Sequence, residues 1–194
     1  MKLKFLCAIA TAFALAAAGC GDDDDGASAA RAAGNGVDRA FVADMIPHHE
    51  SAIEMAKLAQ RRGESAFVKQ LAADIVRSQA AEIATMRSED RALAAAGVKA
   101  GSLGVPEHMK GMDHDPQALT TADAFDAAFI AMMIPHHQGA LEMADAEIAR
   151  GADPELKALA EAIIDAQRRE IAAMRDHAAD GGGGDTSHEG DDHM

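Results

Sequence analysis

The sequence predicts an all-α fold, a four-helix bundle formed by two duplicated αα-hairpins. The first observation is a repeat: residues 41–56 and 129–144 are identical at 11 of 16 positions, at an offset of 88 residues. The same offset aligns residues 71–87 with 159–175, where 9 of 17 positions are identical. Two separate segments that share one offset indicate a duplicated unit of two elements. Apolar residues in these segments recur every three or four positions, so each element is expected to be a helix.

The expected helices also have the residues that begin and end helices. Gly63 is placed to end the first helix and Ser65 to cap the second. In the second unit Asp153 is the expected cap, and Pro154 takes the first helical position, which suits proline. Two such hairpins close most simply into a bundle with pseudo-twofold symmetry. The helices should cover about residues 37–62, 65–94, 122–150 and 153–178.

The first residues have the pattern of an export signal, so residues 1–19 are set apart from the fold. Lys2 and Lys4 begin this segment, and residues 5–15 are an apolar run too short to span a bilayer permanently. Small residues then lead to Cys20, and this junction resembles the lipobox of bacterial lipoproteins. We therefore expect an exported lipoprotein, anchored in the membrane through Cys20 and facing the periplasm or the cell exterior. The alternative is an ordinary secretory signal in which Cys20 is incidental.

The rest of the chain divides into a tether, one domain and a tail. The tether is rich in Asp, Ala, Gly and Ser without periodicity, which predicts flexibility. Glycines and prolines should keep the crossover between the units from forming a fifth long helix, and the tail should be disordered. The expected boundaries are 20–36 for the tether, 37–178 for the domain, 37–94 and 122–178 for its units, 97–121 for the crossover, and 179–194 for the tail.

Charge and cysteine content limit the function. The 194 residues include 32 acidic and 18 basic side chains, a net charge of −14. Nucleic acid requires a basic face, so we expect no nucleic-acid partner, whereas an acidic protein suits a cation. Cys7 lies in the expected signal and Cys20 at the anchor, so neither a disulfide nor a cysteine metal site is expected.

Each unit places histidines and methionines on one helical face. Met45 stands three residues before His48 and four before His49, so these side chains can meet on a helix. Met55 lies two turns beyond His48, roughly 10 Å along the axis, and joins them only if the side chains converge. Neutral, soft thioethers combined with imidazoles suit copper, with Cu(I) favoured, and no organic cofactor is expected. The candidate metal ligands are His48, His49, His136, His137, Met45, Met55, Met86, Met133, Met143 and Met174.

Two further groups of residues could support this site. Carboxylates often orient the imidazoles that bind a metal, and the candidates for that role are Glu54, Glu82, Glu142 and Glu170. The crossover adds secondary metal candidates within seven residues, namely His108, Met109, Met112 and His114. No packing role for these four is evident, so metal capture and a solvated loop are the two interpretations.

Structural and enzymatic interpretations compete with metal binding. Methionines at core spacing commonly fill gaps in packing, and the histidines could be buried groups that hydrogen bond Gln79 and Glu82. A four-helix di-iron enzyme needs Glu-x-x-His on two helices, and no Glu in this chain has a His three residues later. Hydrolase motifs and phosphate loops are also missing from the sequence, so we expect no enzyme. Metal-assisted catalysis by a His-His pair is the enzymatic alternative, and nothing specifies its substrate.

Two sequence blocks resemble the DUF305 family. They read Met-Ile-Pro-His-His-x-x-Ala-x-x-Met-Ala, each followed by Gln-x-x-Glu-Ile-x-x-Met, and the resemblance covers residues 38–94 and 123–178. It implies a ferritin-like four-helix bundle, an exported location and a functional His-His motif, and some family members are copper-binding proteins linked to copper resistance. By position it points to His48, His49, His136 and His137, with Met45, Met55, Met133 and Met143 beside them.

The second unit departs from the first beside its histidines, which puts equal affinity of the two halves in question. Met132, Gln138 and Gly139 stand where the first unit has Asp44, Glu50 and Ser51.

These features predict a non-enzymatic, lipid-anchored copper-binding protein for copper buffering, resistance or transfer outside the cytoplasm. Its partners would be the metal ion and the membrane, and the alternatives for a protein partner are a second copy in a homo-oligomer and a copper-handling protein. The competing hypothesis is a structural or interaction bundle of the cell envelope, in which the His pairs are hydrogen-bonding groups of the core.

Overall fold

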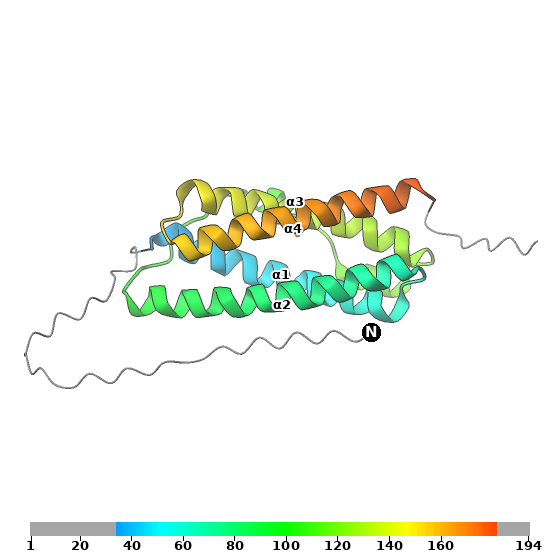
Figure 1. The fold of residues 1–194 in the computed structure, drawn as a ribbon, viewed down its shortest axis with the longest axis horizontal. Coiled ribbons are helices and arrows are strands. Elements are labelled where there is room, and N and C mark those ends of the chain that lie inside the picture. The colour runs from blue at the N-terminus through cyan, green and yellow to red at the C-terminus, as the bar shows by residue number, and fades with distance from the viewer. Residues whose placement is uncertain (1–33, 182–194) are drawn as a thin grey trace, which may run out of the picture. The chain divides into compact units, whose positions relative to one another are not determined.

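The computed structural model describes residues 34–181, which contain four long helices and no strand. These are α1 (Gly36–Arg62), α2 (Ala66–Ala95), α3 (Phe125–Arg150) and α4 (Pro154–Ala179), and they lie side by side (Figure 1). The predicted four-helix bundle is therefore confirmed. The expected signal, Cys20, nearly all of the expected tether and residues 182–194 lie outside the described residues. Among the helices that are described, none has the length and apolarity required to cross a membrane.

The bundle is assembled as two antiparallel hairpins. Helix α1 packs mainly on α2, and α3 mainly on α4. The hairpins meet chiefly through α1 and α3, with a smaller contact between α2 and α4. The paired helices α1 and α3 are therefore the place where equivalent residues of the two units can face each other.

Residue-level signals explain where the helices begin and end. Asn35 caps α1 in a capping box with Asp38, Ser65 caps α2, and Asp153 followed by Pro154 starts α4 as the sequence predicts. Gly63 follows α1, and its N–H donates to the carbonyl of Ala59. Each cap satisfies backbone N–H groups that would otherwise lack partners at a helix end.

Two aspartates join the hairpins at opposite ends of the bundle. Asp38 of α1 accepts hydrogen bonds from the backbone N–H groups of Ala152 and Asp153, both at 2.9 Å. Asp126 of α3 accepts from the N–H groups of Glu64 and Ser65, both at 2.8 Å. The two clasps are related by the 88-residue offset, and each secures the start of a helix in the other hairpin. A hydrogen bond to a charged group contributes about 1.5–3 kcal/mol.

The core is divided into two clusters of buried side chains, and each cluster contains residues of both units. All six candidate methionines of the helices are fully buried. The sequence grouped Met45 with Met55 as members of one unit, but the structure places them in different clusters because two helical turns and more separate them. One cluster contains Met45, Met86 and Met143, and the other contains Met133, Met174 and Met55.

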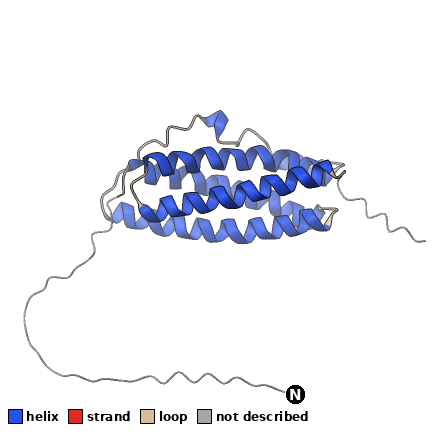
Figure 2. Ribbon diagram, turned by 45° about the horizontal axis from the view of Figure 1, so that its top comes forward, coloured by secondary structure: helices blue, strands red, loops and turns tan. Residues whose placement is uncertain are grey.

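The crossover between the hairpins contains no long helix, as predicted. Its regular elements are two short 3-10 helices, η1 (Glu107–Met109) and η2 (Pro116–Thr121). The segment runs along the outside of the bundle (Figure 2). It is fixed to α1 through Lys110, whose Nζ lies 3.0 Å from Oδ2 of Asp44. The crossover is thus held over the helices rather than free in solvent.

Candidate metal centre

The four predicted histidines are buried where α1 meets α3. The exposed fraction is 1% for His48 and 0% for His49, His136 and His137. The rings of His48 and His136 lie against each other across the two units, tilted by 36° with 3.7 Å between centroids. Burying an imidazole without polar partners is costly, so four of them in one region need a physical reason.

The hydrogen bond of His48 decides which of its ring nitrogens is free. Its Nε2 lies 3.0 Å from the backbone carbonyl of His136, and a carbonyl only accepts. Nε2 therefore carries the hydrogen, and Nδ1 keeps its lone pair in the neutral ring. Nδ1 is buried without a hydrogen bond of good geometry, although the backbone of Lys110 lies close enough to the ring to favour its protonated form, and neither ring nitrogen of His136 has a partner. These nitrogens are available to a metal.

The outer histidine of each pair is held by a glutamate from the neighbouring helix. His49 Nε2 lies 2.6 Å from Glu82 Oε2, and His137 Nε2 lies 2.6 Å from Glu170 Oε2. The carboxylate accepts from Nε2 and leaves Nδ1 as the basic nitrogen, and both Nδ1 atoms are buried without a partner. A carboxylate that fixes an imidazole in this way is the usual support of a metal-binding histidine.

Burial also favours the neutral form of the central histidines. The pKa of His48 lies well below its ordinary value. Burial is the main cause, and the neighbouring His49 and His137 lower the pKa further. Burial likewise lowers the pKa of His136 well below the ordinary value, followed by the nearby His48 and His137. A neutral imidazole offers a lone pair to a metal, whereas a protonated one does not.

Two glutamines add unpartnered polar groups to the interior. Gln79 and Gln167 are each 2% exposed, and neither end of either amide has a hydrogen-bond partner. Each stands about one turn before the glutamate of its own helix, Glu82 or Glu170. The expected bond between Gln79 and a histidine is not formed, so the structural network proposed from the sequence is only half present. Each buried unpaired polar atom costs about 1–3 kcal/mol.

Glu54 and Glu142 lie on the surface, away from the buried histidines. Both side chains are exposed, and Glu54 accepts a hydrogen bond from Nε2 of Gln117 at 2.9 Å. Glu54 follows His48 by six residues, which places it about 120° around the helix, too far to contact the same ring. The expectation that these two carboxylates orient the histidines is therefore wrong.

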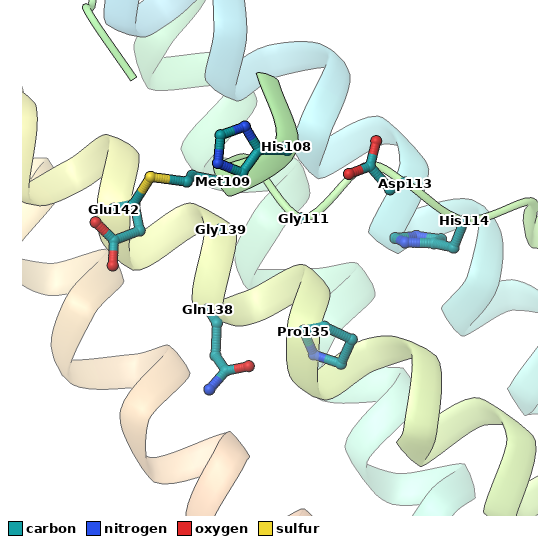
Figure 3. Close-up of a pocket in the computed structure, with 9 residues that line it drawn as sticks. All are labelled: His108, Met109, Gly111, Asp113, His114, Pro135, Gln138, Gly139 and Glu142. Carbon is teal, nitrogen blue, oxygen red and sulfur yellow. The ribbon is translucent and has the colours of Figure 1, made fainter. Parts of the chain in front are cut away.

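The crossover candidates occupy two different environments, one half-buried and one exposed. His114 is half-buried, and its ring lies 5.2 Å from that of His136, centroid to centroid. Burial lowers the pKa of His114, although the charge of Asp113 opposes the shift. His108 is exposed, and Met109 and Met112 are each 40% exposed. His108, Met109 and His114 line one pocket of about 440 Å³ between the crossover and α3 (Figure 3).

Glycines let the crossover backbone lie directly on α3. A Cβ on Gly139 would lie 2.1 Å from the carbonyl of Lys110, and Gly111 has a φ of +68°, which favours glycine. In the first unit Ser51 takes the place of Gly139. The differences between the units at Gly139 and Asp44 have a cause that spacing along one helix does not reveal. Gly139 admits the crossover, and Asp44 binds its Lys110.

The side chains are arranged in pairs rather than as a preformed cage. In residues 34–181 no three His, Cys, Asp or Glu side chains converge as they would around one ion. A metal at the centre would therefore use a few imidazole nitrogens, and the soft donors buried in the same bundle are the six methionines of the core. The donor set, with free neutral nitrogens and soft sulfur, fits copper better than a hard cation.

Comparison with protein families finds one model that covers most of the chain. The model of a domain of unknown function, DUF305, matches residues 14–93 and 38–178. No curated protein matches the chain significantly.

Solved structures with the same fold come from proteins of similar sequence. CopM in its Cu(I)-bound form is 34% identical, with a TM-score of 0.64, over 75% of this chain and 98% of that chain. CopM in its apo, Cu(II)-bound and Ag-bound forms also matches. A DUF305 fragment from Deinococcus radiodurans is 32% identical, with a TM-score of 0.62, over 74% of this chain and 96% of that one. A DUF305 protein from Streptomyces coelicolor is 29% identical, with a TM-score of 0.64, over 75% and 92%.

Proposed function

The chain belongs to the DUF305 family, and from that premise we propose that it binds copper between the His pairs at the centre of its bundle. The protein would buffer copper, confer copper resistance or hand copper on, without catalysing a reaction. The similarity to CopM, which has been solved with copper bound, supports this proposal.

One observation carries the proposal: the central imidazoles are buried with free nitrogens. Nδ1 of His48, His49 and His137 and both nitrogens of His136 have no hydrogen-bond partner. A histidine whose only role is to stabilise a core would pair its nitrogens, since unpaired buried groups cost free energy. Carboxylates fix two of the rings from outside, so the basic nitrogens are held ready for an ion.

The neighbouring methionines favour Cu(I) over harder ions. Thioethers are neutral and polarisable, and they bind Cu(I) in preference to magnesium or calcium. Each methionine cluster takes members from both units, for example Met45 and Met143. A copper ion at the interface between the hairpins would therefore draw ligands from both halves of the duplication.

The location that we propose rests on the sequence. Residues 1–19 have the pattern of an export signal that ends before Cys20, so the protein would be a lipoprotein outside the cytoplasm. Copper chemistry based on His and Met suits an oxidising compartment, because thioethers and imidazoles do not form disulfides. The anchor is tested by mass spectrometry of the exported chain, which should show acyl chains on Cys20 that Cys20→Ser lacks.

The second candidate is a structural bundle, and the two short His–Glu hydrogen bonds favour it. Such bonds stabilise a core without any metal, at about 1.5–3 kcal/mol for a charged partner. On this hypothesis, removing the histidines lowers stability, and copper does not raise the melting temperature. The unpaired nitrogens of the same rings are the observation that this hypothesis does not explain.

A thermal melt separates the two functions. The protein without residues 1–19, carrying Cys20→Ser, is heated alone and with excess Cu(I), Cu(II) or Zn(II), and helicity is followed by circular dichroism because the chain has no Trp or Tyr. A ligand present at a hundred times its dissociation constant should add about 2.7 kcal/mol of stability.

The matched variant replaces His48, His49, His136 and His137 with Ala. We expect a rise in melting temperature with Cu(I) for the parent protein and no rise for a variant that is still helical. An unchanged melting temperature of the parent with every metal would refute the copper proposal and favour the structural one. A copper-induced rise that survives all four substitutions would show that the assigned centre is wrong.

A further inference from the structure

The crossover carries metal-ligand side chains that lie outside the buried centre. The pocket between this segment and α3 has imidazole, thioether and carboxylate groups on its walls, from His108, Met109, His114 and Glu142 (Figure 3). His108 and Met109 are exposed. Exposed side chains of this kind can turn toward an ion at little cost, because water surrounds them before and after the movement.

His114 connects this pocket to the interior. Its Nε2 is buried and has no hydrogen-bond partner, although the residue as a whole is only half-buried. Its ring lies 5.2 Å from that of His136, and His136 lies 3.7 Å from His48, measured between centroids. Three imidazoles therefore form a continuous row from the open pocket to the pair at the interface of the hairpins.

The fold holds this row in place. Lys110 ties the crossover to Asp44 of α1 at 3.0 Å, and its pair with Glu107 at 2.6 Å lies within the crossover itself. Gly139 allows the Lys110 carbonyl to lie against α3 at a distance that any side chain at this position would prevent. The approach of His114 to His136 thus depends on a fastened crossover and not on a chance position of a loop.

We propose that the crossover pocket is an acceptance site for a soft cation, in which His108 and Met109 capture the ion and His114 passes it to His136. The inference rests on the proposed function, since the ion's destination is the copper centre. The transfer is a ligand exchange: the ion bonds to a nitrogen of His136 and then leaves His114. No electron is transferred, and no proton moves when both imidazoles are neutral.

The geometry also gives the transfer a direction within the duplicated bundle. Both ring nitrogens of His136 lack a partner and its ring lies 5.2 Å from that of His114, whereas Nε2 of His48 is already bonded to the His136 carbonyl. An incoming ion would therefore meet the second unit first and reach His48 through it. Cu(I) suits such a relay because it accepts few ligands and prefers sulfur and imidazole.

The test compares rates of copper uptake in matched variants of the chain without residues 1–19. His188 and His193 are replaced by Ser in every variant to remove competing ligands. Cu(I) is supplied as its coloured bicinchoninate complex, and the loss of colour measures transfer to the protein. The variants are His114→Ala, the double change His108→Ala with Met109→Ala, and the control Gln117→Ala, which alters the crossover without removing a soft ligand.

We expect His114→Ala to slow uptake by about tenfold while the final amount of bound copper stays the same. The double change should weaken the initial capture, and Gln117→Ala should have the rate of the unchanged protein. Uptake by His114→Ala at the unchanged rate would overturn the proposed relay. A melt of each variant without metal verifies that the bundle is still folded.

A second measurement separates this proposal from the copper centre itself. In the variant that lacks His48, His49, His136 and His137, titration with Ag(I) should still shift the NMR signals of the His108 and His114 rings. If those signals do not move, the capture site is wrong whatever the core binds. If they move in an unsubstituted chain whose core takes up no metal, the copper centre and the transfer step are both wrong, and the capture site alone stands.

Discussion

The two halves of the bundle share one arrangement of histidines but differ in what covers it. In each half the outer histidine is bonded to a glutamate at 2.6 Å, and the ring of the inner histidine lies against that of its counterpart. The crossover, which is not duplicated, contacts both halves, but in the second half its backbone lies against the helix itself, at Gly139. The first half has Ser51 at that position and contributes Asp44 as an anchor. The histidines are therefore the same in both copies, whereas the crossover between the copies gives the two His pairs different surroundings.

The two ends of the bundle differ in a similar way. Asp38 and Asp126 make equivalent clasps, yet Glu147 lies beside Asp38, whereas its equivalent in the first unit is Ala59. Glu147 is fully buried. Burial, the hydrogen bond with Asp38 and the charge of Asp38 raise the pKa of Glu147 to about 8. One clasp thus contains a carboxyl group that stays protonated at neutral pH, and the other does not.

The largest predicted effect concerns this buried carboxyl group. An unfolded Glu147 loses its proton near pH 4.5, whereas the folded one keeps it to about pH 8. The free energy of unfolding should therefore fall as the pH rises between these values, by at most about 5 kcal/mol. The charge of Asp153 adds to the shift and Lys157 opposes it. Glu147→Gln cannot ionise and should remove this fall, as urea unfolding of the metal-free protein at several pH values would show.

Asp126→Asn provides the control at the other end. Burial opposes ionisation of Asp126, but hydrogen bonds from Ser65 and Glu64 outweigh it and lower the pKa. This clasp is therefore complete above the ordinary pKa of Asp and is lost only in acid. Asp126→Asn should lower stability by about 1–3 kcal/mol equally across neutral and alkaline pH. A Glu147→Gln profile with the same slope as the unchanged protein would contradict the assignment.

The next effect tests the crossover by exchanging equivalent residues of the two units. In Gly139→Ser the new Cβ would collide with the Lys110 carbonyl, so the crossover must move outward, and we expect a loss of about 2 kcal/mol. Hydrogen exchange should become faster across residues 107–114. The reverse change, Ser51→Gly, meets no crossover and should cost only about 0.5 kcal/mol, the difference in helix propensity. Equal losses in the two variants would mean that the halves do not differ in this respect.

The fold could be predicted from the sequence because its determinants are local and repeated. The apolar period, Gly63, Ser65 and the Asp153-Pro154 pair determine the helices, and a shared offset of 88 residues defines the hairpins. The burial of the His pairs followed from their place on the apolar stripe. Helical spacing also placed Glu82 and Glu170 on faces that meet the neighbouring helix, where they bond His49 and His137.

The remaining features depend on contacts between units, which spacing within one helix does not reveal. The contact between the His48 and His136 rings and the mixing of methionines between units arise from the packing of α1 on α3. Glu54 and Glu142 were expected to orient the histidines because they lie close to them in sequence. They point to another side of the helix and therefore do not reach the rings. The sequence does carry one sign of the crossover contact: the second unit has Gly139 where the first has Ser51. A glycine within a helix often marks a place where another backbone approaches closely.

The smallest predicted effect asks whether the halves bind metal equally. Glu82→Gln and Glu170→Gln keep the shape of each side chain but weaken its bond to the histidine, and each should reduce copper affinity by about tenfold. Because the two bonds have the same length, the losses should match, even though the two halves contact the crossover through different residues. Competition for Cu(I) with a chelator, in a background with His108→Ala and His114→Ala, measures the buried centre alone. A loss in only one variant would place the ion within one half, so that the duplicated histidines serve different roles; matched losses would mean that one copper centre draws equally on both.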